Sequence, residues 1–194
     1  MGAMLPALME RNGETAQTTN QQSIINMNDL NEKILQWADD KGILANGTPE
    51  GQLTKTLEEL IETAQAVALY DLVAESYHFN DEDANERLES VKDGIGDVYV
   101  TICIHAEMCE YEVSHHDIVD EPIANKAIFE ELGKHIITLA ANDQVGWHYS
   151  IIARLLDLLA QNHRLTLREC VEHSYSVISK RTGKMIDGVF VKSK

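Results

Sequence analysis

The chain has 194 residues, of which 32 are acidic and 16 basic, so its formal net charge is −16 with histidine neutral. Such acidity argues against a nucleic-acid-binding protein, which needs a basic surface to neutralise phosphates. No stretch approaches the roughly 20 consecutive apolar residues of a membrane span, so we expect a cytoplasmic protein without membrane contacts. With 44% apolar residues, 6% aromatic residues and only three prolines, the composition favours long helices around one core. The predicted class is all-α.

The N-terminal region divides into a leader and a first short helix. Residues 1–27 are polar and lack periodicity, which predicts a flexible leader before a single domain over 28–194. Asp29 is a candidate N-cap, and Gly42 is the predicted end of the helix. The apolar stripe of this helix consists of Leu30, Ile34 and Trp37.

A second helix is predicted from the pair Thr48-Pro49, an N-cap followed by an N1 proline, to about Ser76. Its predicted apolar stripe consists of Leu53, Leu57, Leu60, Ile61, Ala64, Val67 and Ala68. Three glutamates cluster away from this stripe, namely Glu58, Glu59 and Glu62. Taken alone, they are typical of a solvated acidic face.

A polar connection over 78–85 leads to a third predicted helix from residue 86 to about 110. The C-terminal half of this helix is apolar on nearly every side, which is typical of a helix buried in a bundle. Four acids lie within about 80° of one another on its helical wheel, namely Glu86, Glu89, Asp93 and Asp97. Gly94 and Gly96 fall within the same helical pattern, where close helix packing is their expected role.

The remaining elements follow a predicted loop over 111–125. Two amphipathic helices are expected at about 126–141 and 147–161, then a last helix that opens with the capping box formed by Thr166 and Glu169. We expect that helix to run through Arg181 and stop at Gly183, before an irregular or extended arm. The last fifteen positions carry five bases, Lys180, Arg181, Lys184, Lys192 and Lys194. They are interpreted either as helix-dipole complementation with a basic tail or as a phosphate clamp.

The acids on the second and third helices indicate a metal site. Like charges at i,i+4 are unfavourable, and Glu89, Asp93 and Asp97 stack two such pairs on a face that becomes buried. Two facing helices that present carboxylates at one level would form an all-oxygen site suited to Mg²⁺ or Mn²⁺.

Other constellations are less suited to chemistry. A di-iron bundle needs a Glu-x-x-His pair on each of two helices, and the one such spacing, Glu112-x-x-His115, falls in the predicted loop. The run His115-His116-Asp117 is read as a polar loop, and His105 as a satisfied core histidine. The three cysteines lack metal or disulfide spacing and are expected to be reduced; they are Cys103, Cys109 and Cys170.

These motifs resemble the MazG-like all-α nucleoside triphosphate pyrophosphohydrolases, a family related to the dimeric dUTP pyrophosphatases. That family carries Glu-Glu-x-x-Glu on one helix and Glu-x-x-Asp on the next. Glu58-Glu59-Leu60-Ile61-Glu62 matches the first half, and the segment 92–98 resembles the second half, with Asp97 at the aspartate. The resemblance covers roughly 28–109 and 162–192, so residues 111–160 are read as an inserted helix pair. Gly94 departs from the pattern by standing at the second-half glutamate, which leaves Asp93 or Glu89 to complete the site.

The resemblance implies an antiparallel helical bundle that hydrolyses ribo- or deoxynucleoside triphosphates to the monophosphate and pyrophosphate with Mg²⁺ or Mn²⁺. The implied metal ligands are Glu59, Glu62, Asp93 and Asp97, with Glu58 as a candidate base. The implied substrate contacts are Lys180, Arg181, Lys184 and Trp37, although Trp37 is equally suited to anchoring its helix. A homodimer or a dimer of dimers is also implied. Two alternatives stay open: a catalytically silent module that binds nucleotides or proteins, and a structural helical oligomer.

Overall fold

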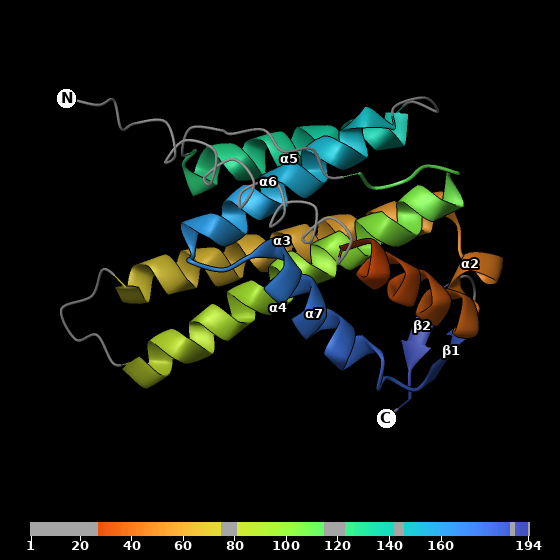
Figure 1. Ribbon diagram of the computed structural model, residues 1–194, viewed down its shortest axis with the longest axis horizontal. Helices are drawn as coiled ribbons and strands as arrows, with labels where there is room; N and C mark the ends of the chain where they lie inside the picture. The colour runs from red at the N-terminus through yellow and green to blue at the C-terminus, as the bar shows by residue number, and fades with distance from the viewer. Residues whose placement is uncertain (1–26, 75–80, 115–122, 142–145, 187–188, 194) are drawn as a thin grey trace, which may run out of the picture.

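The computed structural model describes residues 27–74, 81–114, 123–141, 146–186 and 189–193. Apart from one short hairpin, its regular elements are helices, as the composition predicts. The helices of the bundle are α3 (Pro49–Ala74), α4 (Asp81–Met108), α5 (Asn125–Ala141), α6 (Trp147–Asn162) and α7 (Leu167–Ile178). Figure 1 shows α3 and α4 running antiparallel through the middle, with α5 and α6 as a second antiparallel pair along one side. Helix α5 contacts α3, α6 contacts α4, and α7 packs across α4.

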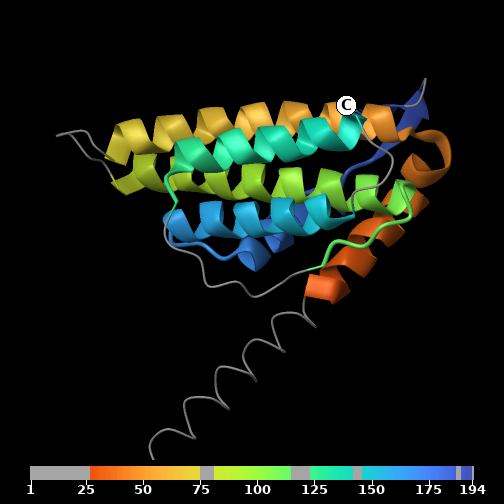
Figure 2. The ribbon, with the colours of Figure 1, turned by 90° about the horizontal axis from the view of Figure 1, so that it is seen from above.

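A helix over residues 27–40 precedes this bundle and lies at an angle to it at one end (Figure 2). The expected start at Asp29 is wrong, because the helix already includes Met27, which is buried together with Leu30 and Ile34. The buried stripe therefore extends one turn further back, and Asp29 is an exposed residue within the helix. Gly42 ends this segment as expected, with φ of 71°, before the single turn α2 (Ile43–Asn46). The predicted leader lies outside the described residues, except for Met27.

Helix α3 begins as predicted, but the face that it buries only partly overlaps the predicted one. The Thr48 hydroxyl oxygen accepts a hydrogen bond from the Gly51 amide at 3.1 Å, which confirms the N-cap before Pro49. The predicted stripe is only partly correct, because Ile61 is 59% exposed and Ala68 is also exposed. The residues of α3 that are buried are Leu53, Thr56, Glu59, Leu60, Thr63 and Val67.

Helix α4 starts earlier than predicted and packs closely on both neighbours. It begins at Asp81 rather than residue 86, with the buried Ala84 anchoring the added turn. A Cβ atom on Gly94 would lie 2.7 Å from the Thr63 hydroxyl oxygen of α3. A Cβ atom on Gly96 would lie 2.2 Å from the Cys170 carbonyl oxygen of α7. The predicted packing role of both glycines is thus confirmed, since they let α4 approach one helix on each side.

Helix α7 ends earlier than predicted, whereas the C-terminal arm is extended, as one of the predicted alternatives has it. The predicted capping box between Thr166 and Glu169 is present, but the helix ends at Ile178, so Arg181 lies beyond it. The arm is extended, which is one of the two predicted alternatives: β1 (Gly183–Ile186) and β2 (Val189–Lys192) form an antiparallel hairpin. Phe190 in this hairpin packs edge-to-face against Trp37 with 6.0 Å between ring centroids. The contact fastens the C-terminal hairpin to the N-terminal helix.

One cluster of buried apolar side chains connects the helices of the bundle. The C-terminal half of α4 lies at its centre, and Val98, Tyr99 and Ile102 are fully buried, as its apolar sequence predicts. All three cysteines are free. Within the described segments, no helix is both long enough and apolar enough to cross a bilayer.

Candidate functional site

The glutamates of α3 have different environments. Glu59 is buried at 9% exposure, whereas Glu58 and Glu62 are exposed. Glu59 therefore faces into the bundle with the buried residues of its helix, and Glu62 lies on the solvent side. The sequence placed all three glutamates away from the core, so the expected position of Glu59 is wrong. The structure makes Glu59 the carboxylate that α3 contributes to the interior.

Asp97 of α4 is the acid that its surroundings perturb most clearly. The pKa of Asp97 is raised from 3.8 to about 6, first by burial and then by the negative charges of Asp93 and Glu59. Arg181 and a hydrogen bond with Ser174 act in the opposite direction and are outweighed. Carboxylates from α3 and α4 thus lie within electrostatic reach of one another, as the two-helix prediction requires.

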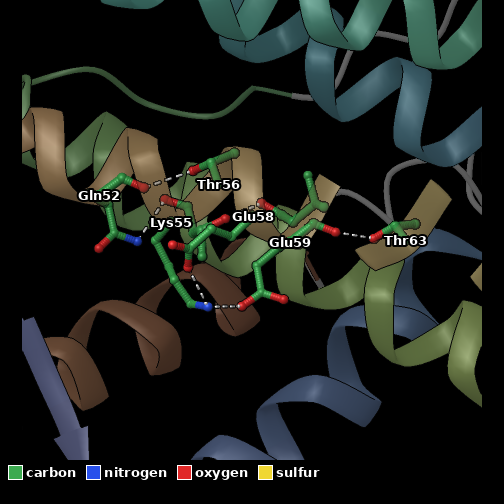
Figure 3. Close-up of polar contacts among 8 residues, drawn as sticks. Gln52, Lys55, Thr56, Glu58, Glu59 and Thr63 are labelled. Atoms are coloured by element: carbon green, nitrogen blue, oxygen red, sulfur yellow. Dashed lines mark hydrogen bonds and ion pairs between the residues drawn. The ribbon is translucent and has the colours of Figure 1, made fainter. Parts of the chain in front are cut away.

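Lys55 supplies a positive charge to the α3 side of this acidic centre. Its Nζ atom lies 2.8 Å from Glu59 Oε1 and 3.1 Å from Glu58 Oε2 (Figure 3). Burial acts to lower the pKa of Lys55, but the hydrogen bonds with Glu59 and Glu58 prevail and raise it. Lys55 precedes these glutamates at i,i+3 and i,i+4, a spacing in the sequence that indicates such ion pairs.

Helix α7 adds two polar residues that the sequence analysis missed. The imidazole of His173 lies between two acids of α4, with Nε2 3.5 Å from Asp93 Oδ1 and Nδ1 3.6 Å from Glu89 Oε2. The buried Ser174 hydroxyl donates a hydrogen bond to the Asp93 carbonyl oxygen at 3.0 Å. No local signal in the sequence pointed to these two residues, because their contacts with α4 depend on the close approach of α7 at Gly96.

The predicted phosphate contacts are only partly gathered at this centre. Arg181 lies close enough to Asp97 to lower its pKa, so the segment after α7 does return positive charge to the acidic helices. Lys180 and Lys184 are exposed. The side chain of Lys192 and the whole of Lys194 lie outside what the structure describes.

Trp37 is a structural anchor in this arrangement. Its ring contacts Phe190, and the residue packs against the core cluster. The indole nitrogen is buried without a hydrogen-bond partner in the described structure. These contacts favour the anchoring interpretation over base stacking.

The donors at this centre have the chemistry of a hard-cation site, although they do not form a closed cage. Asp93 Oδ1 is buried and has no hydrogen-bond partner within the described part of the chain, and His173 Nε2 lies 3.5 Å from it. Such an oxygen fits a cation ligand, and carboxylate oxygens are the donors that Mg²⁺ and Mn²⁺ prefer. Among the described residues, no three His, Cys, Asp or Glu side chains are close enough together to hold an ion as they stand. Movement of at least one side chain is therefore needed to complete a cage.

Position 94 has no room for the glutamate of the family pattern. The Cα and Cβ atoms of Thr63 would lie only 3.1 and 3.2 Å from a Cβ atom there, so a longer side chain would push α3 and α4 apart. Asp93 lies near Asp97, whereas Glu89 is exposed and paired with Lys92 at 2.7 Å, and His173 of α7 contacts both acids. Of the two substitutes, Asp93 is better placed to complete the site.

The prediction for His105 is confirmed, whereas the other histidines singled out in the sequence lie outside the described residues. His105 is 3% exposed and shares a 2.9 Å hydrogen bond with the Tyr149 hydroxyl group, so it is a satisfied core residue as predicted. Burial lowers the pKa of His105 to about 4. The run His115-His116-Asp117 lies outside the described residues, and so does the histidine of Glu112-x-x-His115.

A surface pocket of about 400 Å³ is lined by none of the candidate-site carboxylates of α3 and α4. It is lined by Glu112, Ser114, Gly146, Trp147, Ser150 and Ile151. The pocket belongs to the region read as an inserted helix pair, and its most prominent side chain is Trp147, which is 56% exposed.

Comparisons with known proteins add no family: the chain matches no family model, no curated protein and no solved structure.

Proposed function

We propose that the protein is a Mg²⁺-dependent nucleoside triphosphate pyrophosphohydrolase whose metal ligands come from α3 and α4. The observation that carries this proposal is the partly buried Asp97 of α4, which lies within electrostatic reach of both Asp93 on its own helix and Glu59 on α3. Grouping like charges in a partly buried place costs free energy, and a bound divalent cation would offset that cost. The match of residues 58–62 to the family motif supports the same chemistry.

The chain's own residues suggest how the reaction would proceed. Glu59, Asp93 and Asp97 would hold the metal, with Glu62 as an outer candidate that must turn inward from solvent. Arg181 would contact the phosphates, and the exposed Glu58 would accept a proton from the attacking water. Bound Mg²⁺ would neutralise phosphate charge and make that water more acidic.

We further propose a homo-oligomer, and one face of α3 supports it. Three large apolar side chains on that helix are exposed, Ile61 at 59%, Leu69 at 44% and Leu72 at 67%. At 100° per residue they fall within about 80° of one another, so they form one apolar stripe. A second copy of the chain would remove this stripe from water.

The activity is tested by measuring pyrophosphate release from ribo- and deoxynucleoside triphosphates with and without Mg²⁺ or Mn²⁺. We expect metal-dependent release, and Glu59→Gln should reduce it by at least about 100-fold. The matched control Glu130→Gln, an exposed residue on α5, should retain the wild-type rate. Pyrophosphate release by Glu58→Gln, which removes the candidate base, is then compared with release by Glu62→Gln, which removes a candidate metal ligand. Release that needs no metal, or no release from any triphosphate, would refute the proposal.

A binding module without catalysis is the second candidate, and the pocket beside Trp147 favours it. In that case nucleotides would quench the fluorescence of Trp147 without being hydrolysed. The quenching would persist in Glu59→Gln and disappear in Trp147→Phe. Because Trp147→Phe keeps an aromatic ring but removes the fluorophore, calorimetry must check that this variant still binds the nucleotide. Hydrolysis that depends on Glu59 would exclude this candidate as the main function.

A further inference from the structure

Lys55 joins the two consecutive glutamates of α3 through one ammonium group. Its contacts of 2.8 Å to Glu59 and 3.1 Å to Glu58 are both short enough for charge-assisted hydrogen bonds. The Glu59 side chain is only 12% exposed, whereas the side chains of Glu58 and Lys55 are 58% and 48% exposed. Figure 3 shows the ammonium group between the two carboxylates. The lysine therefore reaches from solvent to a carboxylate at the edge of the interior.

The position of this ammonium group matters because Glu59 is a proposed metal ligand. A carboxylate beside Asp97 and Asp93 needs a compensating positive charge, and Lys55 provides one to Glu59. The same contact directs Glu59 Oε1 toward Lys55, while the carboxylates of the centre are not closed around a common point. Lys55 is thus bound to one oxygen of the carboxylate that the proposed metal site needs as a ligand.

The contact is also easily broken. Lysine carries a point charge on a flexible four-carbon stem, so its ammonium group can move several ångströms while its backbone stays fixed in α3. Ion pairs with this much exposure contribute little stability and exchange readily with solvent. A second cation at Glu59 would repel the ammonium group, and a nearby polyanion would attract it.

We infer that Lys55 is an exchangeable counter-ion of the site: it neutralises Glu58 and Glu59 when no metal is bound, and moves to the phosphates when Mg²⁺ and a triphosphate enter. This inference rests on the proposed function. It assigns Lys55 as a substrate-binding residue that the family motif does not include. It also means that Mg²⁺ alone competes with Lys55, whereas Mg²⁺ together with a polyphosphate gives the displaced ammonium group a new partner.

The test uses the full chain and two binding measurements by isothermal titration calorimetry. Mg²⁺ alone is titrated first, and inorganic pyrophosphate is then titrated at saturating Mg²⁺. In Lys55→Met, loss of a competing surface-type ion pair should tighten Mg²⁺ binding about two- to fivefold. Loss of a charge-assisted phosphate contact should weaken pyrophosphate binding about tenfold.

The matched control is Lys126→Met, which removes a lysine from the i,i+4 pair with Glu130 on α5. Its neighbour Asn125 hydrogen-bonds to Asp71, which lies about 18 Å along α3 from Glu59. This variant should leave both affinities unchanged, and circular dichroism should show that both variants fold.

Opposite shifts in Lys55→Met support the inference, since a merely structural lysine would weaken both affinities or neither. Mg²⁺ binding that is unchanged or weaker in Lys55→Met overturns the inference while leaving the proposed function intact. A wild-type protein that binds no Mg²⁺, with or without pyrophosphate, overturns the proposed function and the inference with it.

Discussion

Replacing Asp97 by asparagine should stabilise the metal-free protein. The pKa of Asp97 is about 6 in the folded state, mainly because of burial, against 3.8 ordinarily. The pKa of Asp97 is higher in the folded state than in the unfolded state, so the protonated carboxyl group stabilises the fold. This stabilisation is fully present below about pH 4 and is lost as the pH rises through 6. At about 1.4 kcal/mol for each unit of pKa, the ionised group costs the fold about 3 kcal/mol at pH 8.

Asp97→Asn removes this ionisation, so its free energy of unfolding should exceed that of the wild type by up to about 3 kcal/mol at pH 8. The gain should fall to about half at pH 5, where the wild-type carboxyl group is mostly protonated in the folded state. Urea unfolding in the presence of EDTA measures both values. The control Asp29→Asn changes an exposed aspartate of the N-terminal helix and should show no such pH-dependent gain.

Mg²⁺ should reverse the order of the two proteins. A ligand that binds only the folded state stabilises it by mass action, so wild type should gain stability with Mg²⁺ and Asp97→Asn should gain much less. An Asp97→Asn variant that is no more stable than wild type at pH 8 would refute the claim that burial and neighbouring negative charges destabilise the ionised Asp97.

Two further predictions concern packing and assembly. Gly96→Ala should destabilise the fold by about 1 to 3 kcal/mol, because the added Cβ atom meets the backbone of Cys170. Gly133 has open space around it, so Gly133→Ala should instead stabilise α5 by up to about 1 kcal/mol in urea unfolding. Leu72→Asp should lower the molecular mass measured by light scattering to that of a monomer, while Val177→Asp, an exposed apolar residue of α7, should not. A wild-type monomer would contradict the proposed oligomer.

Features with a local cause were predictable from the sequence. The N-cap at Thr48, the capping box of Thr166 and Glu169 and the end of a helix at Gly42 each depend on a few neighbouring residues, and each is present. The packing role of Gly94 was also predictable, because a glycine inside a helical pattern suggests close approach of a neighbour.

Features that depend on which helices meet were not predictable. The hydrophobic pattern of α3 placed Ile61 inside and Glu59 outside, yet the crossing with α4 buries Thr56, Glu59 and Thr63 instead. Tertiary packing outweighed amphipathicity there. Likewise, no local signal connects His173 with Asp93, since the contact exists only because Gly96 lets α7 cross α4.

The location of a bound metal ion tests the central claim most directly. Crystals grown with Mn²⁺ and inorganic pyrophosphate would show the ion by its anomalous scattering. We predict a peak about 2.0 to 2.3 Å from carboxylate oxygens of both Glu59 and Asp97, with the Lys55 ammonium group turned toward the pyrophosphate. A Mn²⁺ peak elsewhere on the molecule, or none at concentrations that saturate binding in solution, would contradict the account.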